Sequence, residues 1–71
     1  MKKIIRDEDV NSYYQSAKDL APFLQVSERQ VHYYREHGKL KAEQKSRARY
    51  QFNKEDVISF LVNEWGFTYE Q

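Results

Sequence analysis

Eight lysine and arginine side chains lie between residues 27 and 54 of this 71-residue chain, and only three acidic side chains accompany them. Segment 1–26 is neutral, and segment 55–71 carries four acidic residues with no basic ones. Cations at this density can bind a polyanion through ion pairs with its phosphate groups. A solvated loop is the alternative interpretation. The net charge of +1 does not separate the two, because it averages over segments of opposite charge.

Within this basic segment, two local signals predict a short helix over residues 28–37. Ser27 and Gln30 have the spacing of a capping box, and Val26 and Val31 have the spacing of a hydrophobic staple. Gly38 ends the helix, because glycine adopts the left-handed conformation without steric cost. The predicted outward-facing residues are Glu28, Arg29, Gln30, His32 and Tyr33.

A first helix is predicted over residues 17–24. Ser16 and Asp19 form a second capping box at its start, and Pro22 predicts that the helix is short or kinked. The same helix start, with Ser16 and Lys18, could instead hold a phosphate group. Only two or three residues connect this helix to the next, so the two helices must cross steeply, as in a helix-turn-helix.

The alternation of apolar and polar side chains in residues 39–52 predicts a β-hairpin with a basic tip. Leu40 and Ala42 alternate with polar residues, a tip over residues 44–46 follows, and Ala48, Tyr50 and Phe52 are expected on the inward face of the second strand. The candidate phosphate-binding cations of this hairpin, or wing, are Lys39, Lys41, Lys45, Arg47 and Arg49. A basic edge also resists unwanted strand pairing, which is the alternative explanation.

A third helix is predicted over residues 54–65, capped by Asn53 together with Asp56 and ended by Gly66. The aromatic residues 65, 67 and 69 are expected to cover the core or to form a dimer contact. The predicted fold class is therefore mainly α with a small β-hairpin. Its architecture is a single winged helix-turn-helix domain over residues 1–71.

In this architecture the second helix has the size to lie in a DNA major groove. The guanidinium of Arg29 suits guanine N7 and O6, whereas Gln30 serves either as a base contact or as part of the cap. His32 binds a base or a phosphate, or is solvated. Tyr33 and Tyr34 differ by about 100° around the helix, so Tyr34 is expected in the core and Tyr33 on a phosphate.

The run "AKDLAPFLQVSERQVHYYREHGKL...RYQFNKEDVISFL" resembles the DNA-binding domain of MerR-type regulators and of excisionase-like small winged helices. The resemblance covers roughly residues 13–62. Its most specific parts are Val26-Ser27, residues 31–34, residues 38–40 and residues 52–57. An arginine usually precedes the tyrosine pair in that family, where this chain has His32. The usual arginine of the wing's second strand is here Tyr50.

The resemblance implies sequence-specific binding of double-stranded DNA by a homodimer, with the second helix in the major groove and the wing on the flanking backbone. It implies a role in transcription regulation, or in plasmid or chromosome segregation as the N-terminal part of a longer protein. The predicted DNA-binding residues are Ser16, Lys18, Ser27, Glu28, Arg29, Gln30, His32, Tyr33, Lys39, Lys41, Lys45, Arg47 and Arg49. The alternatives are an excisionase-type architectural DNA binder and a protein-interaction module that does not bind DNA. RNA binding is disfavoured by the lack of an aromatic sheet platform.

Other classes find little support in the sequence. The chain has no cysteine, and His32 and His37 lie on different faces of the helix without a third metal ligand. With two glycines there is no phosphate-binding loop. We therefore expect no enzyme activity, no metal, no cofactor and no small-molecule effector. The acidic residues that follow Ile5 exclude a signal peptide, and no apolar run is long enough for a membrane span. We expect a cytoplasmic protein of a bacterium, plasmid or phage, associated with the nucleoid or a plasmid.

Overall fold

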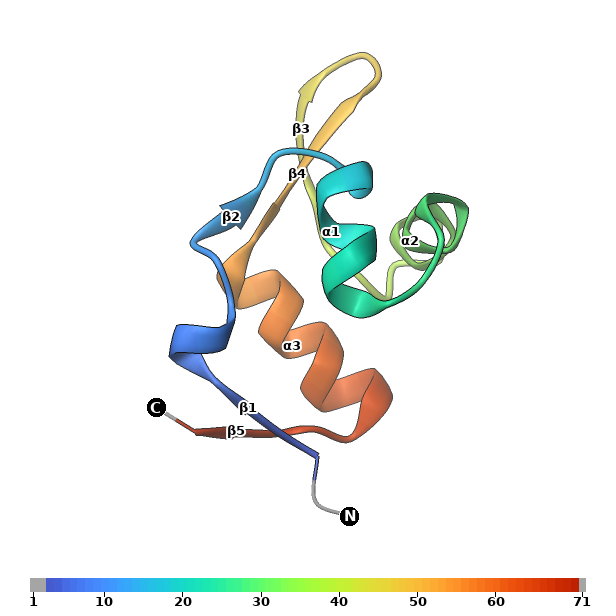
Figure 1. Cartoon of the computed structure of the whole chain (residues 1–71). Helices are drawn as coiled ribbons and strands as arrows, with labels where there is room; N and C mark the ends of the chain where they lie inside the picture. Colours follow the sequence, from blue (N-terminus) through green and yellow to red (C-terminus); the bar gives the residue numbers. More distant parts are fainter. Residues whose placement is uncertain (1–2, 71) are drawn as a thin grey trace.

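Within residues 3–70, three α-helices and five short strands make up the fold (Figure 1). The computed structural model describes residues 3–70. In chain order the elements are β1 (Ile4–Arg6), a 3-10 turn η1 (Asp7–Asp9), β2 (Tyr13–Tyr14), α1 (Ala17–Leu24), α2 (Glu28–Glu36), β3 (Glu43–Ser46), β4 (Arg49–Asn53), α3 (Lys54–Trp65) and β5 (Thr68–Glu70). Within the described part, no helix combines the length and the apolar character needed to cross a membrane.

The predicted fold class, mainly α with a small hairpin, is wrong. Helices make up 47% and strands 25% of the structure, and the five strands form two sheets, so the fold is a mixture of α and β. The prediction missed β1, β2 and β5, which have only two or three residues each. Strands this short show no periodic pattern in a sequence, because their pairing partners lie far away along the chain.

The larger sheet has the strand order β2-β4-β3, with both pairs antiparallel. Tyr14 lies opposite Phe52 in the β2–β4 pair, and both side chains are buried. β3 and β4 form the hairpin, which extends beyond β2 and away from the helices (Figure 1). The sheet thus anchors the base of the hairpin in the core and leaves its tip in solvent.

The second sheet joins the two ends of the described chain as a parallel pair, β1 with β5. Ile5 lies opposite Tyr69, and the backbone N–H of Thr68 donates to the carbonyl of Lys3 at 2.7 Å. This sheet lies at the opposite end of the molecule from the hairpin tip (Figure 1). Phe67 and Tyr69 pack against the core there, so Phe67 and Tyr69 act as core cover, one of the two roles predicted for them.

The helices begin and end as the local signals predict, except at the start of α3. Ser16 Oγ accepts the backbone N–H of Asp19 at 3.4 Å, and Gly38 and Gly66 have φ +73°. Asn53 does not cap α3 with its side chain. Its Oδ1 instead accepts a hydrogen bond from the side-chain Nε2 of Gln51 at 2.8 Å. The backbone N–H of Lys54 donates to the carbonyl of Ser12 at 3.0 Å, so the loop before β2 satisfies this helix start.

A single apolar core lies between α1, α3 and the larger sheet, with α2 contributing Val31. Its buried side chains are Ile5, Val10, Tyr14, Ala17, Leu20, Ala21, Leu24, Val31, Leu40, Phe52, Val57, Phe60 and Leu61. Tyr34 packs against this core with its ring 4.9 Å from that of Phe60, as predicted. α2 therefore contributes little to the core and presents most of its surface to solvent.

Asp7 connects the N-terminal segment to α3 and β5. Its carboxylate accepts hydrogen bonds from the Tyr69 hydroxyl at 2.8 Å and from Lys54 Nζ at 3.1 Å. The hydrogen bond from Tyr69, followed by that from Lys54, holds the pKa of Asp7 below its usual value of 3.8. A carboxyl with a lowered folded-state pKa stabilises the fold above its unfolded-state pKa, and this stabilisation is lost as the pH falls through the folded-state pKa.

We therefore expect Asp7→Asn to reduce the free energy of unfolding near neutral pH and to make no difference in strong acid. Urea unfolding at about pH 7 and at about pH 2 measures both effects, on either side of the carboxyl titration. Glu8→Gln is the matched control, because Glu8 is an exposed neighbour for which no ion pair occurs among residues 3–70. Equal losses at both pH values would contradict the role of the Asp7 charge.

Candidate nucleic-acid interface

α2 presents an exposed polar face at its N-terminal end. Ser27 Oγ accepts the backbone N–H of Gln30 at 3.1 Å, so the predicted cap is confirmed. Glu28, Arg29 and Gln30 are exposed, and the Gln30 side chain donates to the Tyr34 hydroxyl at 3.3 Å rather than completing the capping box. The helix is one residue shorter than predicted and ends at Glu36.

Tyr33 lies on the exposed side of α2. Half of its surface is exposed, and its ring stacks on that of His37 with 4.1 Å between the centroids. The neighbouring Tyr34, which was predicted to lie in the core, is turned toward Phe60. The two adjacent tyrosines therefore differ in burial as expected. The Tyr33 hydroxyl thus remains at the surface beside the exposed face of α2.

The hairpin differs from the predicted wing in its register. Residues 39–42 are not a strand, and the predicted tip over residues 44–46 belongs to β3. Arg47 and Ala48 form the turn, so Ala48 is exposed and not inward-facing as predicted. The apolar alternation therefore begins only at Tyr50, because a two-residue turn leaves Ala48 outside the strand pairing. Arg47 and Arg49 consequently belong to the turn and to β4, not to one face of a single strand.

Several cations of α1, α2 and the hairpin have no ion pair within the described part of the chain. Residues 3–70 contain five ion pairs, which include Lys39 with Glu64 at 3.4 Å and Lys45 with Glu43 at 2.7 Å. Apart from Lys3, every described lysine and arginine without an ion pair lies between residues 18 and 49. These are Lys18, Arg29, Lys41, Arg47 and Arg49. Such cations are free to exchange water for phosphate oxygens.

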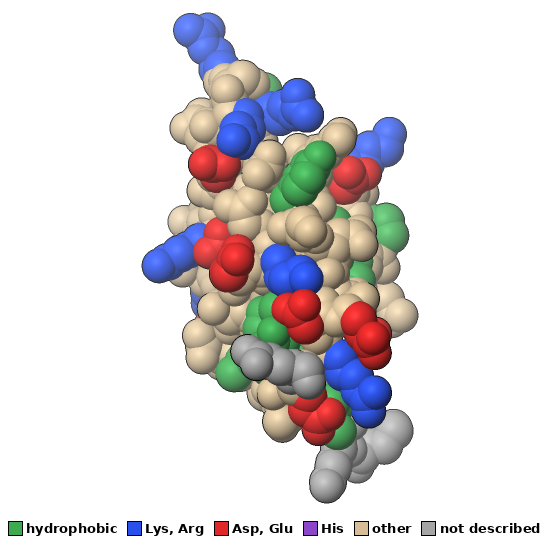
Figure 2. Space-filling model, turned by 90° about the vertical axis from the view of Figure 1, so that its left-hand side faces the viewer, with side chains coloured by type: hydrophobic (Ala, Val, Ile, Leu, Met, Phe, Trp, Pro, Cys, Tyr) green, Lys and Arg blue, Asp and Glu red, His purple; other side chains and the backbone are tan. Residues whose placement is uncertain are grey.

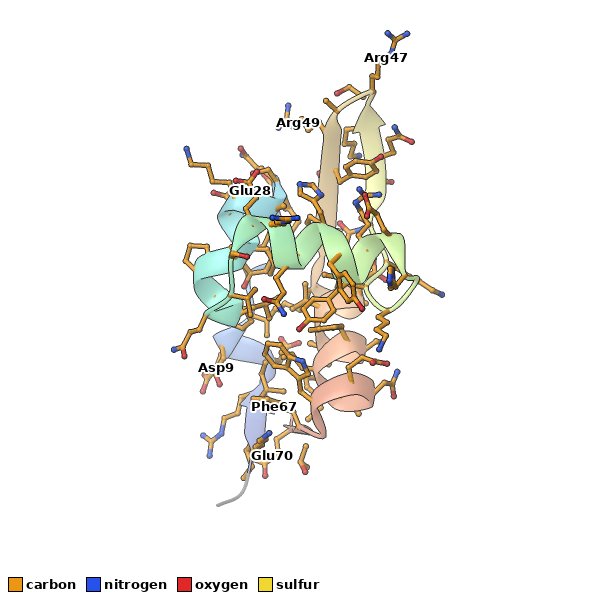
Figure 3. The ribbon with its side chains drawn as sticks, turned by 90° about the vertical axis from the view of Figure 1, so that its right-hand side faces the viewer. Asp9, Glu28, Arg47, Arg49, Phe67 and Glu70 are labelled. Carbon is orange, nitrogen blue, oxygen red and sulfur yellow. The ribbon has the colours of Figure 1, made fainter. Side chains whose placement is uncertain are left out.

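The views of the whole molecule show how these residues are distributed. In Figure 3, α2 crosses the front of the molecule, Arg47 extends from the tip of the hairpin, and Arg49 extends to the side on which Glu28 starts α2. Asp9, Phe67 and Glu70 lie at the opposite end of the molecule. Figure 2 shows lysine and arginine outnumbering acids around the hairpin, and mixed with acids over the other half of this face. The described residues thus give the molecule one basic end.

At the start of α1, the Ser16 hydroxyl accepts the backbone N–H of Asp19. Lys18 is exposed and has no ion pair within residues 3–70. α1 packs against both α2 and β4, so Lys18 belongs to the same end of the molecule as α2 and the hairpin. Two exposed carboxylates, Asp19 and Glu28, also lie here and reduce the local positive charge. The basic character of this end therefore depends mainly on the hairpin.

His32, a predicted DNA contact, lies half-buried between α2 and the hairpin. Its Nδ1 accepts the Nε–H of Arg35 at 3.4 Å, and its ring meets that of Tyr50 nearly edge-on, at 6.3 Å between centroids. The Arg35 guanidinium lies 3.9 Å from the centre of the Tyr50 ring. Arg35 and Tyr50 are not among the DNA-binding residues predicted from the sequence. The spacing of His32 and Arg35, three residues apart on a helix, predicts a contact, but the approach of Tyr50 depends on the tertiary structure.

Away from this end, an apolar hollow of about 330 Å³ lies between β1, the end of α1 and the end of α3. It is lined by Ile4, Ile5, Asp9, Phe23, Leu24, Gln25, Leu61, Trp65 and Phe67. No group of His, Asp or Glu side chains within residues 3–70 is arranged to hold a metal ion.

No protein-family model matches the chain, and no curated protein or solved structure is significantly similar to it. The family resemblance therefore rests on the quoted residues alone.

Proposed function

We propose that the chain binds double-stranded DNA, with α2 in the major groove and the β3–β4 hairpin on the adjacent backbone. The observation that carries the proposal is that the cations Lys18, Arg29, Arg47 and Arg49, which have no ion pair within residues 3–70, belong to α1, α2 and the hairpin, the basic end of the molecule. Unpaired, exposed cations release counterions from DNA on binding without first losing a protein partner.

The dimensions of α2 support the same proposal. Its nine residues give it a length of about 13 Å, and a major groove about 12 Å wide admits one helix with a diameter of about 10–12 Å. The small share of α2 in the core leaves Glu28, Arg29 and Gln30 exposed at its N-terminal end. N-terminal residues of a recognition helix are those that contact base edges.

The finer parts of the proposal follow from the resemblance to MerR-type and excisionase-like DNA-binding domains. They are sequence-specific binding as a homodimer on a repeated site, in transcription regulation or in plasmid or chromosome segregation, in the bacterial cytoplasm. A single copy would cover a small footprint, which favours two copies on one site. An excisionase-type role, bending DNA for recombination, uses the same surface.

Arg29→Ala tests the assignment of α2. We expect it to relax the sequence preference by about 1–3 kcal/mol at one base pair, while binding to random duplex DNA changes much less. Selection of bound sequences from a randomised duplex pool, followed by fluorescence anisotropy on the selected and a scrambled duplex, measures both effects. Lys18→Ala is the matched control, because it removes one unpaired cation from α1 and is expected to weaken both duplexes equally.

Selected sequences without any common motif, for wild type and variant alike, would contradict base-specific binding by α2. A duplex RNA of the same sequence is included, and tighter binding to it than to DNA would contradict the DNA assignment.

Protein binding is the second candidate function, and the apolar hollow beside Trp65 and Phe67 favours it. A protein-interaction module would retain its partner when Arg47 and Arg49 are reversed to glutamate, because these residues lie at the other end of the molecule. A DNA-binding protein with those reversals would lose its duplex.

A further inference from the structure

Three side chains connect α2 to the hairpin at the edge of the apolar core, against which Tyr50 packs. Arg35 lies with its guanidinium 3.9 Å from the Tyr50 ring centre and donates from Nε to His32 Nδ1 at 3.4 Å. His32 completes the set with its edge-on contact to the same ring, at 6.3 Å. Both positions at which this chain departs from the family pattern, His32 and Tyr50, thus belong to one cluster, which we call the α2–hairpin joint.

The chemistry of the joint removes Arg35 from the surface that binds anions. Its side chain is only 20% exposed, and its Nη2 lies 3.6 Å from Glu36 Oε1. Because His32 Nδ1 accepts a hydrogen bond, the ring proton of neutral His32 resides on Nε2. Arg35 is therefore committed to contacts within the protein, in contrast to the unpaired Arg29 on the same helix.

Besides the joint, β4 of the hairpin contacts β2, α1 and α3. β2 pairs with β4 only at residues 52 and 53, which form the base of the hairpin. All four residues of β3 are exposed, and the turn at residues 47 and 48 is exposed as well. Within the described residues, the aromatic and cation–π contacts between α2 and the hairpin all involve Tyr50. The joint is thus placed to set the angle between α2 and the hairpin.

We propose that the joint of His32, Arg35 and Tyr50 holds the hairpin at the angle at which α2 and the hairpin contact one DNA duplex together. Arg35 is then a positioning residue and not a phosphate contact. This inference rests on the proposed DNA binding for its consequence, but the geometry of the joint can be tested without DNA.

The first test measures the angle in the free protein. The chain has no cysteine, so Glu28→Cys and Ser46→Cys introduce two unique spin-label sites on α2 and on β3. We expect a single narrow distance distribution that broadens in Arg35→Met and in Tyr50→Leu. Tyr50→Phe is the matched control and is expected to retain the narrow distribution, because it keeps the aromatic face. Circular dichroism verifies that each variant is folded.

The second test is a double-mutant cycle on the affinity for a duplex, using the same substitutions without labels. We expect Arg35→Met and Tyr50→Leu each to weaken binding by roughly two- to fivefold, as for an exposed cation–π contact, and the double variant to lose no more than either single one. Tyr50→Phe is expected to bind as the wild type does. Since Tyr50→Phe lacks the hydroxyl but keeps the ring, binding retained in Tyr50→Phe shows that the shared loss does not come from a missing phosphate hydrogen bond of Tyr50.

Two results would overturn the inference. One is an unchanged distance distribution in folded Arg35→Met and Tyr50→Leu. The other is a loss of affinity that occurs only in Arg35→Met and makes the slope of log K against log salt about 0.9 shallower. This result would make Arg35 a phosphate contact. If the wild type itself binds no duplex, the proposed function fails, and the distance distributions alone decide whether the joint exists.

Discussion

Replacing Arg47 and Arg49 together with alanine is expected to weaken duplex binding by roughly fiftyfold at about 0.1 M salt. Both side chains are exposed and without ion pairs within residues 3–70, and they extend from the end of the hairpin (Figure 3). Each lost phosphate contact removes about 0.9 from the slope of log K against log salt, so the double variant should be about 1.8 shallower. Anisotropy titrations over a series of salt concentrations measure this slope.

The control removes the same amount of charge from the other end of the molecule. Lys3→Ala with Arg6→Ala deletes two cations next to or within β1, where Arg6 pairs with Glu70 at 3.7 Å. This control should leave the slope unchanged if the hairpin binds the phosphates, because contacts rather than net charge determine counterion release. Equal slopes in both double variants would show that only net charge matters and would remove the hairpin from the interface.

Phe52→Ala is expected to lower the free energy of unfolding by about 3–5 kcal/mol. Phe52 is completely buried in β4 and lies opposite the buried Tyr14 of β2. The loss combines the transfer free energy of the ring with the cavity that it leaves between sheet and helices. A chain of this length has a total stability of roughly 4–10 kcal/mol, so the variant is expected to lose a large part of it.

Urea unfolding followed by circular dichroism tests this prediction. Val62→Ala on α3 is the comparison, because Val62 is 37% exposed and its truncation opens no internal cavity. We expect Val62→Ala to change the free energy of unfolding by no more than about 0.5 kcal/mol. A Phe52→Ala variant as stable as Val62→Ala would mean that β4 is not part of the core.

The ends of α1 and α2 could be predicted from the sequence because the interactions that form them are local. Ser16 and Ser27 each accept a backbone N–H three residues later, and Gly38 follows α2 with a left-handed backbone. These interactions join residues a few positions apart, so they leave a recognisable spacing. The positive charge of residues 27–54 is likewise a property of composition alone.

The strands and the register of the hairpin were predicted poorly, for the converse reason. β1 pairs with β5 across more than 60 residues, as in Ile5 with Tyr69, and nothing local marks so short a strand. Asn53 has the residue type of a helix cap, but its side-chain oxygen accepts the side-chain amide of Gln51, and the Ser12 carbonyl accepts the first N–H of α3. A local propensity is overridden where the fold gives a side chain or a backbone group another partner.

The candidate site divides in the same way. Residue types and spacing were sufficient to nominate the cations and the exposed positions of α2, since charge and helical periodicity belong to the chain itself. The packing of the folded chain determines which of these cations remain available, because some of the partners that neutralise or stack on a side chain come from distant segments. Lys39 is paired by Glu64 and Arg35 is stacked on Tyr50, whereas Arg29 and Arg47 have no such partner within residues 3–70.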